Sequence, residues 1–344
     1  MRIDLLKLSI GLTAVLAAGC GYDSPSTGPY PPPPPPLSGS LWTASASPSA
    51  ILRLAPSQLG STGALAPATM ITTSSAELST LVGIAFDGAG NLWVASQDDS
   101  RLLEFVPAGL SSSGSAAAMT VIVSNAGSLS GPTSLAFDPE HRLWVANRAN
   151  GTLVRFDPAQ LAASGSPLPA VIVSGVGVPT SIAFDAAGAL WVSNSTGNTL
   201  ARYSAAQLAA SGSPAPAVLL STTGTSLVKP SGLAFDAFGT LWVANTNGAS
   251  LVAFGPDQLA ASGSPEPRVV LASNDGSLAL PVGLAFDDEG NLWVVGGGGA
   301  VTEFARASLG ASGAPAPSAR LQLTGFALFW NAAFWPRPAG LPLF

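Results

Sequence analysis

The stretch SLAFDPEHRLWVAN, residues 134–147, contains two short apolar segments separated by a turn, as expected for two antiparallel strands. The phrase occurs four more times, as GIAFDGAGNLWVAS from residue 83, SIAFDAAGALWVSN from 181, GLAFDAFGTLWVAN from 232 and GLAFDDEGNLWVVG from 283. The Leu-Trp tryptophans, beginning with an additional copy at Trp42, are spaced by 51, 51, 47, 51 and 51 residues. A repeat of this length indicates an array of similar structural units.

Each repeat unit predicts four strands, which in the best example are residues 134–138, 142–147, 152–156 and 170–174. The first, second and fourth of these are apolar at consecutive positions and do not alternate between apolar and polar residues. Both faces of each small sheet must therefore be covered. Blades stacked radially in a β-propeller meet this requirement, because each blade packs between two neighbours.

The two ends of the repeat array are incomplete in complementary ways. The first unit, SLWTAS at residues 40–45, has no AFD strand before it, and NAAFWP at 331–336 resembles SLAFDP but has no LWV strand after it. We expect strands between residues 41 and about 72 to form one blade with a strand at 331–335. The predicted fold is therefore an all-β, six-bladed β-propeller with four strands per blade, spanning residues 38–344 and closed by the two ends of the chain.

A second repeated phrase, DPAQLAASGSPLP at residues 157–169, lies between the third and fourth strands of the unit. Asp157 suits a helix N-cap, Pro158 suits the first helical position, and Gly165 suits a C-terminal stop. We therefore expect one or two helical turns at the outer edge of each blade, where they would help cover the outer strand.

The GLAFDxxGNLWVA phrase resembles NHL-type six-bladed propellers and is similar to repeats of the gluconolactonase-like and streptogramin lyase-like propellers. The resemblance covers roughly residues 38–340 and indicates architecture more than activity. The gluconolactonase-like enzymes hold a divalent metal with Glu, Asn and Asp side chains near the inner strands. The corresponding residues here are Val82, Thr133, Thr180, Ser231 and Val282, with Asn331 in the closing strand as the one residue of matching type. We expect no metal and no other cofactor, because hydroxyls and valines are poor ligands for a hard cation.

The streptogramin lyase resemblance implies a catalytic histidine, and the sequence has one histidine, His141, on the tight turn of DPEHRLW. A histidine on such a turn is ordinarily a solvated surface residue. With one His and one Cys in the whole chain, no second nucleophile and base pair of the Ser-His or Cys-His type can be assembled. The sequence therefore predicts that the protein is not an enzyme.

The N-terminal segment MRIDLLKLSIGLTAVLAAGC has the basic start, apolar core and small residues of a secretory signal. Its end resembles the lipobox of bacterial lipoproteins, which implies acylation of Cys20. We expect a signal peptide at 1–19, the lipidated Cys20 with a Pro-rich spacer at 20–37, and attachment to the bacterial cell envelope. Gly21, in place of the Asp that retains enteric lipoproteins in the inner membrane, favours the outer membrane.

Polar residues beside the inner strands form a candidate ligand face. They are Thr133, Thr180 and Ser231 before the first strand of a unit and Asn147, Asn194 and Asn245 after the second, with Ser45, Ser96 and Gly296 at equivalent places. This set suits a carbohydrate or a peptide, and it equally suits turn formation, because Asn tolerates left-handed backbone. The repeated Asp87, Asp138, Asp185, Asp236 and Asp287 and the repeated tryptophans are interpreted as turn and core residues.

The amino-acid composition argues against one class of binding partner. With 13 Lys and Arg and a net charge of −6, the sequence predicts no nucleic-acid surface. The leading hypothesis is a monomeric, lipid-anchored binding or scaffold module with an unidentified protein or carbohydrate partner. The alternatives are a propeller hydrolase or lyase acting on a lactone or cyclic ester, and a purely structural surface protein.

The lipid anchor is directly testable. Replacing Cys20 by Ser removes the only thiol that can be acylated, so the Cys20→Ser protein is expected in the soluble fraction after signal processing. Labelling with an alkyne-tagged fatty acid and fractionation beside the unaltered protein measure this. Recovery of the variant only with detergent, as for the unaltered chain, would contradict the assignment.

Overall fold

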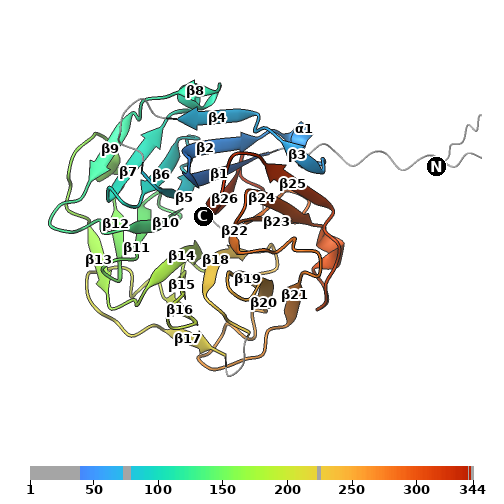
Figure 1. Cartoon of the computed structure of the whole chain (residues 1–344). Coiled ribbons are helices and arrows are strands. Elements are labelled where there is room, and N and C mark those ends of the chain that lie inside the picture. Colours follow the sequence, from blue (N-terminus) through green and yellow to red (C-terminus); the bar gives the residue numbers. More distant parts are fainter. Residues whose placement is uncertain (1–38, 73–78, 223–225, 340, 342–344) are drawn as a thin grey trace, which may run out of the picture. The chain divides into compact units, whose positions relative to one another are not determined.

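Six small antiparallel sheets stand radially around a central axis and form a ring (Figure 1). This computed structural model describes residues 39–72, 79–222, 226–339 and 341. The chain divides into two units, residues 1–35 and 36–344, and all described residues belong to the second. The predicted signal peptide, Cys20 and the spacer at 20–37 lie outside the described residues. No helix in the described part has the length and apolar character needed to cross a bilayer.

Each blade contains four antiparallel strands, ordered from the channel outwards, and two blades gain a short fifth strand from a neighbour. Blade 1 contains β26 (Leu328–Trp335), β1 (Ser40–Ser47), β2 (Ser49–Leu54) and β4 (Thr69–Thr72). Blade 2 contains β5 (Leu81–Phe86), β6 (Leu92–Ser96), β7 (Arg101–Phe105) and β9 (Thr120–Val123). Blade 3 contains β10 (Pro132–Phe137), β11 (Leu143–Asn147), β12 (Thr152–Phe156) and β13 (Val171–Ser174).

The other three blades repeat this plan. Blade 4 contains β14 (Pro179–Phe184), β15 (Leu190–Asn194), β16 (Thr199–Tyr203) and β17 (Val218–Ser221). Blade 5 contains β18 (Pro230–Phe235), β19 (Leu241–Asn245), β20 (Ser250–Phe254) and β21 (Val269–Ala272). Blade 6 contains β22 (Pro281–Phe286), β23 (Leu292–Gly296), β24 (Ala300–Phe304) and β25 (Ala319–Leu323). The predicted fold, with six blades of four strands, is confirmed.

Ring closure depends on a pair of strands from opposite ends of the chain. β26 pairs antiparallel with β1, with Phe334 opposite Leu41 and Ala333 opposite Trp42. The same register joins Phe137 to Leu143 in blade 3, so Phe334 takes the place of Phe137 as predicted. The closing strand begins at Leu328, three residues before the predicted start at residue 331.

Neighbouring blades are joined by aromatic packing. The repeat tryptophan of one blade meets the phenylalanine at the end of the next blade's inner strand in edge-to-face pairs. The pairs are Trp42–Phe86, Trp191–Phe235, Trp242–Phe286 and Trp293–Phe334, with ring centroids 5.8, 6.4, 6.5 and 6.3 Å apart. Such a pair contributes about 0.5–1.5 kcal/mol beyond the apolar area it buries. The last pair joins blade 6 to the closing strand, so the ring is continuous through blade 1.

The outer edges of the blades are covered by their neighbours. The loop between the third and fourth strands adds a glycine beside the outer strand of the preceding blade in parallel orientation. The pairs include Ile122 with Gly165, Val173 with Gly212, Leu220 with Gly263 and Leu271 with Gly313. β3 (Gly63–Leu65) and β8 (Gly114–Ser115) do the same for blades 6 and 1. The prediction that Gly165 ends a helix is wrong. The helix ends at Leu161, and the N–H and C=O of Gly165 are bonded to Val121 and Val123 of blade 2.

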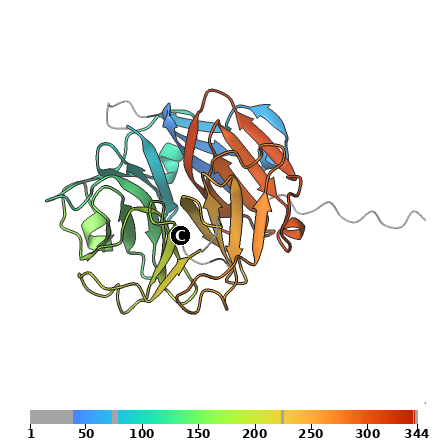
Figure 2. The ribbon, with the colours of Figure 1, turned by 60° about the horizontal axis from the view of Figure 1, so that its bottom comes forward.

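Single helical turns precede these glycines at the periphery of the ring, as Figure 2 shows for α2 (Pro158–Leu161) and η2 (Arg306–Ser308). α1 (Pro56–Leu59) and the 3₁₀ turn η1 (Pro107–Leu110) are equivalent in blades 1 and 2, and hydrogen-bonded turns replace them in blades 4 and 5. Asp157 is the N-cap residue of α2, but its carboxylate pairs with Arg155 at 2.9 Å. The Oε1 of Gln160 accepts the Asp157 N–H at 2.7 Å, so the repeated Gln shapes this turn.

Truncation after Leu323 tests ring closure. The shortened chain loses β26, which leaves the inner edge of β1 unpaired and Trp293 without Phe334. We expect aggregation or a loss of several kcal/mol, a large part of the stability of an ordinary domain. Thermal unfolding followed by circular dichroism measures this.

The matched control is truncation after Pro338, which keeps all of β26. This control is expected to melt close to the full chain. Equal melting temperatures for the chain ending at Leu323 and for the full chain would show that the two termini do not share a blade.

Candidate functional site in the central channel

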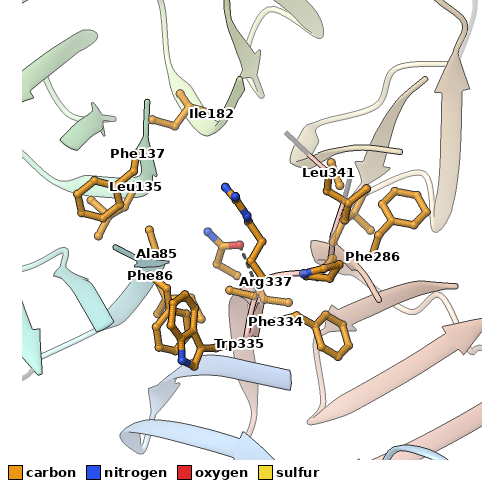
Figure 3. Close-up of a pocket in the computed structure, with 18 of the residues that line it drawn as sticks. Ala85, Phe86, Leu135, Phe137, Ile182, Phe286, Phe334, Trp335, Arg337 and Leu341 are labelled. Carbon is orange, nitrogen blue, oxygen red and sulfur yellow. Dashed lines mark hydrogen bonds between the residues drawn. The ribbon is translucent and has the colours of Figure 1, made fainter. Parts of the chain in front are cut away.

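A cavity of about 340 Å³ occupies the central channel. Side chains or backbone of inner strands from all six blades line it, so it lies on the axis of the ring (Figure 3). Asp87, Gly88 and His141 belong to the turns between first and second strands and also line it. The cavity therefore extends towards that face of the propeller. Its volume falls in the range of small-molecule sites in proteins.

A ring of aliphatic side chains forms the wall of the cavity. Five blades contribute a branched residue at the same position of the inner strand, namely Ile84, Leu135, Ile182, Leu233 and Leu284, and the closing blade contributes Ala332. Each branched side chain packs in the same cluster as the tryptophan of the preceding blade, as Leu135 does with Trp93. Ala332 packs with Trp293 in the same way. The smaller Ala332 leaves the closing blade as the recessed side of the ring.

The inner strands of neighbouring blades approach one another closely at the residue that precedes each member of the aliphatic ring. The residues at this level are Gly83, Ser134, Ser181, Gly232, Gly283 and Asn331. A Cβ at Gly232 would lie 2.3 Å from the Val282 carbonyl oxygen, and one at Gly283 would lie 2.8 Å from the Asn331 Cα. Ser134 and Ser181 accept the Ile182 and Leu233 N–H groups of the next blade at 3.2 and 3.3 Å. Small residues are thus required for the blades to meet at this level.

The C-terminal segment that follows β26 lies at the mouth of the cavity. Arg337, Pro338 and Leu341 all line it, and Leu341 packs against the cluster that contains Phe286. In Figure 3 the Arg337 side chain extends towards the centre of the apolar ring. Trp335 stacks on Phe86 at 5.0 Å beside it. The site therefore combines a mainly apolar interior, in which Ser181 and Asn331 are polar, with the Arg337 guanidinium at its mouth.

The hydroxyls of the predicted ligand face bond to neighbouring blades. Thr133 donates to the Pro179 carbonyl at 3.2 Å, Thr180 to Pro230 at 2.9 Å and Ser231 to Pro281 at 3.3 Å. Thr133 and Ser231 are buried. Asn331 lies level with Ser134, one residue beyond these hydroxyls, so it is not equivalent to them. Ligand binding by these residues stays a prediction, and the geometry shows that they link the blades.

The predicted asparagines brace the loops that lead into the inner strands. Asn147 accepts the Ser130 N–H at 3.1 Å, and Asn245 accepts the Val228 N–H at 3.2 Å. Asn194 is buried, but its Oδ1 has no partner among the described residues. The loop of blade 4 is shorter, as the 47-residue tryptophan spacing shows, and Gly177 lies against this oxygen. The shortened loop thus removes the amide that the other two asparagines bind.

The repeated aspartates have the structural role that the sequence predicts. Asp138 accepts the N–H groups of Glu140 and Arg142 with one oxygen and the Trp144 Nε1–H with the other, at 2.9 Å. Asp185, Asp236 and Asp287 repeat this arrangement with their own tryptophans. In the closing blade Trp335 stands where this Asp would be. The Nε1–H of Trp42 consequently has no partner among the described residues.

Acidic residues gather in blade 6 without forming a metal site. Burial raises the pKa of Glu303, the Ser318 hydroxyl opposes this, and Asp287 and Glu289 raise it further. Burial and the charges of Asp287 and Asp288 raise the pKa of Glu289. Across residues 39–72, 79–222, 226–339 and 341, no three His, Cys, Asp or Glu side chains are grouped so that they could hold a metal ion.

Comparisons with known proteins show what fold the chain has and no more than that. No family model and no curated protein matches it. A protein of unknown function from Bacteroides caccae matches with a TM-score of 0.61 and 11% identity over 86% of this chain and 98% of that chain. The structure of a nidogen/laminin complex matches with a TM-score of 0.58 and 14% identity, over 86% and 97%. At these identities the likeness shows the β-propeller fold alone.

A streptogramin B lyase structure also matches, with a TM-score of 0.49 and 12% identity. The match covers 66% of this chain and 66% of the lyase, so this chain spans just under two thirds of the lyase's length. A match at this level supports no statement about activity.

The sequence analysis did not predict the residues that line the channel cavity. The aliphatic ring was visible only as part of the repeated core phrase, and Ala332 could have been noticed as its one small member. Arg337 and Leu341 follow the last repeat, so no comparison among repeats could assign them a place. His141 lines the channel mouth because its turn lies on that face, opposite to the predicted ligand face.

The unpartnered Trp42 provides a test of the Asp–Trp contact. Trp42→Phe removes an indole N–H that has no described partner, whereas Trp293→Phe breaks a buried 2.8 Å bond to Asp287. Both variants lose similar volume, so we expect Trp293→Phe to cost about 2 kcal/mol more in free energy of unfolding. Chemical denaturation of the two variants measures the difference, and equal costs would refute the assigned role.

Proposed function

We propose that the protein is a non-enzymatic binding module that holds an apolar small molecule in its central channel. The observation that carries this proposal is the cavity of about 340 Å³ whose wall is built by aliphatic residues from the inner strands. Transfer of apolar surface from water into such a site stabilises the complex by roughly 0.8 kcal/mol per buried methylene. The NHL-type repeats provide the rigid scaffold, and the lipid anchor at Cys20 would hold this scaffold at the outer membrane of a bacterial envelope.

The polar groups near the cavity favour binding over catalysis. Ser181 lines the cavity, but its hydroxyl accepts the Leu233 N–H of the next blade. His141 lies at the mouth on a tight turn with φ of 61°. Within the described residues, the His141 imidazole forms no hydrogen bond with a serine, threonine or carboxylate, which supports a binding role over nucleophilic catalysis.

A chain-length series of neutral n-alkanols tests the proposal. Isothermal titration calorimetry is expected to show one saturable site, with affinity rising about fourfold per added methylene until the cavity is filled. Ala332→Leu gives the closing blade the residue type of the other five and fills the recessed side of the ring. This variant is expected to fold and to bind 1-dodecanol at least tenfold more weakly.

Ala187→Phe is the matched control. It places a phenylalanine on an exposed turn outside the channel, where blade 5 already has Phe238. Binding by this variant is expected to equal that of the unaltered protein. Absence of saturable alkanol binding, or equal affinity in the Ala332→Leu protein, would contradict the proposed function.

A further inference from the structure

The charge at the mouth of the channel points to a narrower class of ligand. We infer that the site selects a single-chain amphiphile with an anionic head, an alkyl carboxylate, whose head pairs with Arg337 while its chain enters the aliphatic ring. This inference rests on the proposed function and adds the chemistry of the head group.

Arg337 is held in place by its neighbours in the sequence. It lies between Pro336 and Pro338, directly after the closing strand, and Pro338 is buried. Proline fixes its own backbone angle and restricts the residue before it, so the backbone at Arg337 has little freedom. The side chain extends from this fixed position over the ring formed by Leu135, Ile182 and the other aliphatic residues (Figure 3).

The guanidinium of Arg337 has no ion-pair partner among the described residues. Several other arginines of the propeller pair with a carboxylate, as Arg142 does with Asp138 at 2.7 Å and Arg202 with Asp185 at 3.0 Å. The side chain of Arg337 is exposed at the channel mouth, which leaves its donors accessible. A guanidinium presents a planar pair of donors that fits a carboxylate in bidentate geometry.

Asp87 is the carboxylate among the residues that line the cavity, and its oxygens already accept hydrogen bonds. One oxygen of Asp87 accepts the N–H groups of Ala89 and Asn91, each at 2.9 Å, and the other accepts the Asn91 side-chain amide at 2.9 Å. Asp87 therefore holds its turn through these hydrogen bonds, and no ion pair joins it to Arg337 among the described residues. An entering anion meets a guanidinium that has no ion pair with a described residue, at the end of a mainly apolar cavity. This combination favours an alkyl carboxylate over a neutral or cationic amphiphile.

Paired probes test the inference. Dodecanoate, 1-dodecanol and dodecyltrimethylammonium are titrated into the full chain at pH 8, where the carboxylate is ionised. Dodecanoate is expected to bind more tightly than 1-dodecanol, and the cation more weakly. Arg337→Gln is expected to weaken dodecanoate binding about fivefold, the upper range for an exposed ion pair, and to leave 1-dodecanol within twofold.

The control variant is Arg148→Gln, which makes the same charge change at an exposed residue on the loop that follows β11. It should leave the affinity for dodecanoate unchanged. Equal losses in Arg337→Gln and Arg148→Gln, or equal losses for both probes in Arg337→Gln, would overturn the inference. If 1-dodecanol binds but dodecanoate binds no more tightly, the head-group inference fails and the proposed function stands. If no probe binds, the proposed function itself fails.

Discussion

The antiparallel pairing of β26 with β1 is the constraint on which the rest of the structure depends. Blades in a propeller contact only their neighbours, so a ring left open would expose one face of its first blade and one of its last. The closing pair places Phe334 against Trp293 and Trp42 against Phe86, so aromatic contacts join blade 1 to both of its neighbours. It also brings the residues that follow β26 to the channel mouth, where Arg337 and Leu341 lie.

The closing blade departs from the repeat where the candidate site is formed. Ala332 replaces a branched residue, and Trp335 replaces the Asp that binds the repeat tryptophan in blades 3 to 6. The second change leaves the Trp42 indole N–H without a described partner, which costs stability when a polar group is buried. In return the same strand supplies a recessed wall and an aromatic side of the cavity. Deviations from a repeat that weaken the scaffold while shaping a cavity are typical of functional sites.

The repeat made the blade count, the shared blade and the structural aspartates predictable. Residues such as Asp138 and Trp144 recur in each copy of the repeat and are therefore expected to have the same structural role in each. Gly165 was misassigned as a helix stop, since its partner Ile122 belongs to another blade and is invisible to local reasoning. The channel cavity was missed because the side chains that line it come from six blades and from the segment that follows β26. Their convergence is a property of the closed ring and not of any single stretch of sequence.

The function proposed for the protein depends on a ligand site in the central channel. A crystal structure of the full propeller grown with 12-bromododecanoate tests it most directly, because the bromine can be located by its anomalous signal. We expect one bromine peak inside the aliphatic ring near Leu135 and Leu284, with the carboxylate beside Arg337. A bromine bound only elsewhere on the propeller, with the channel empty of the probe, would contradict it.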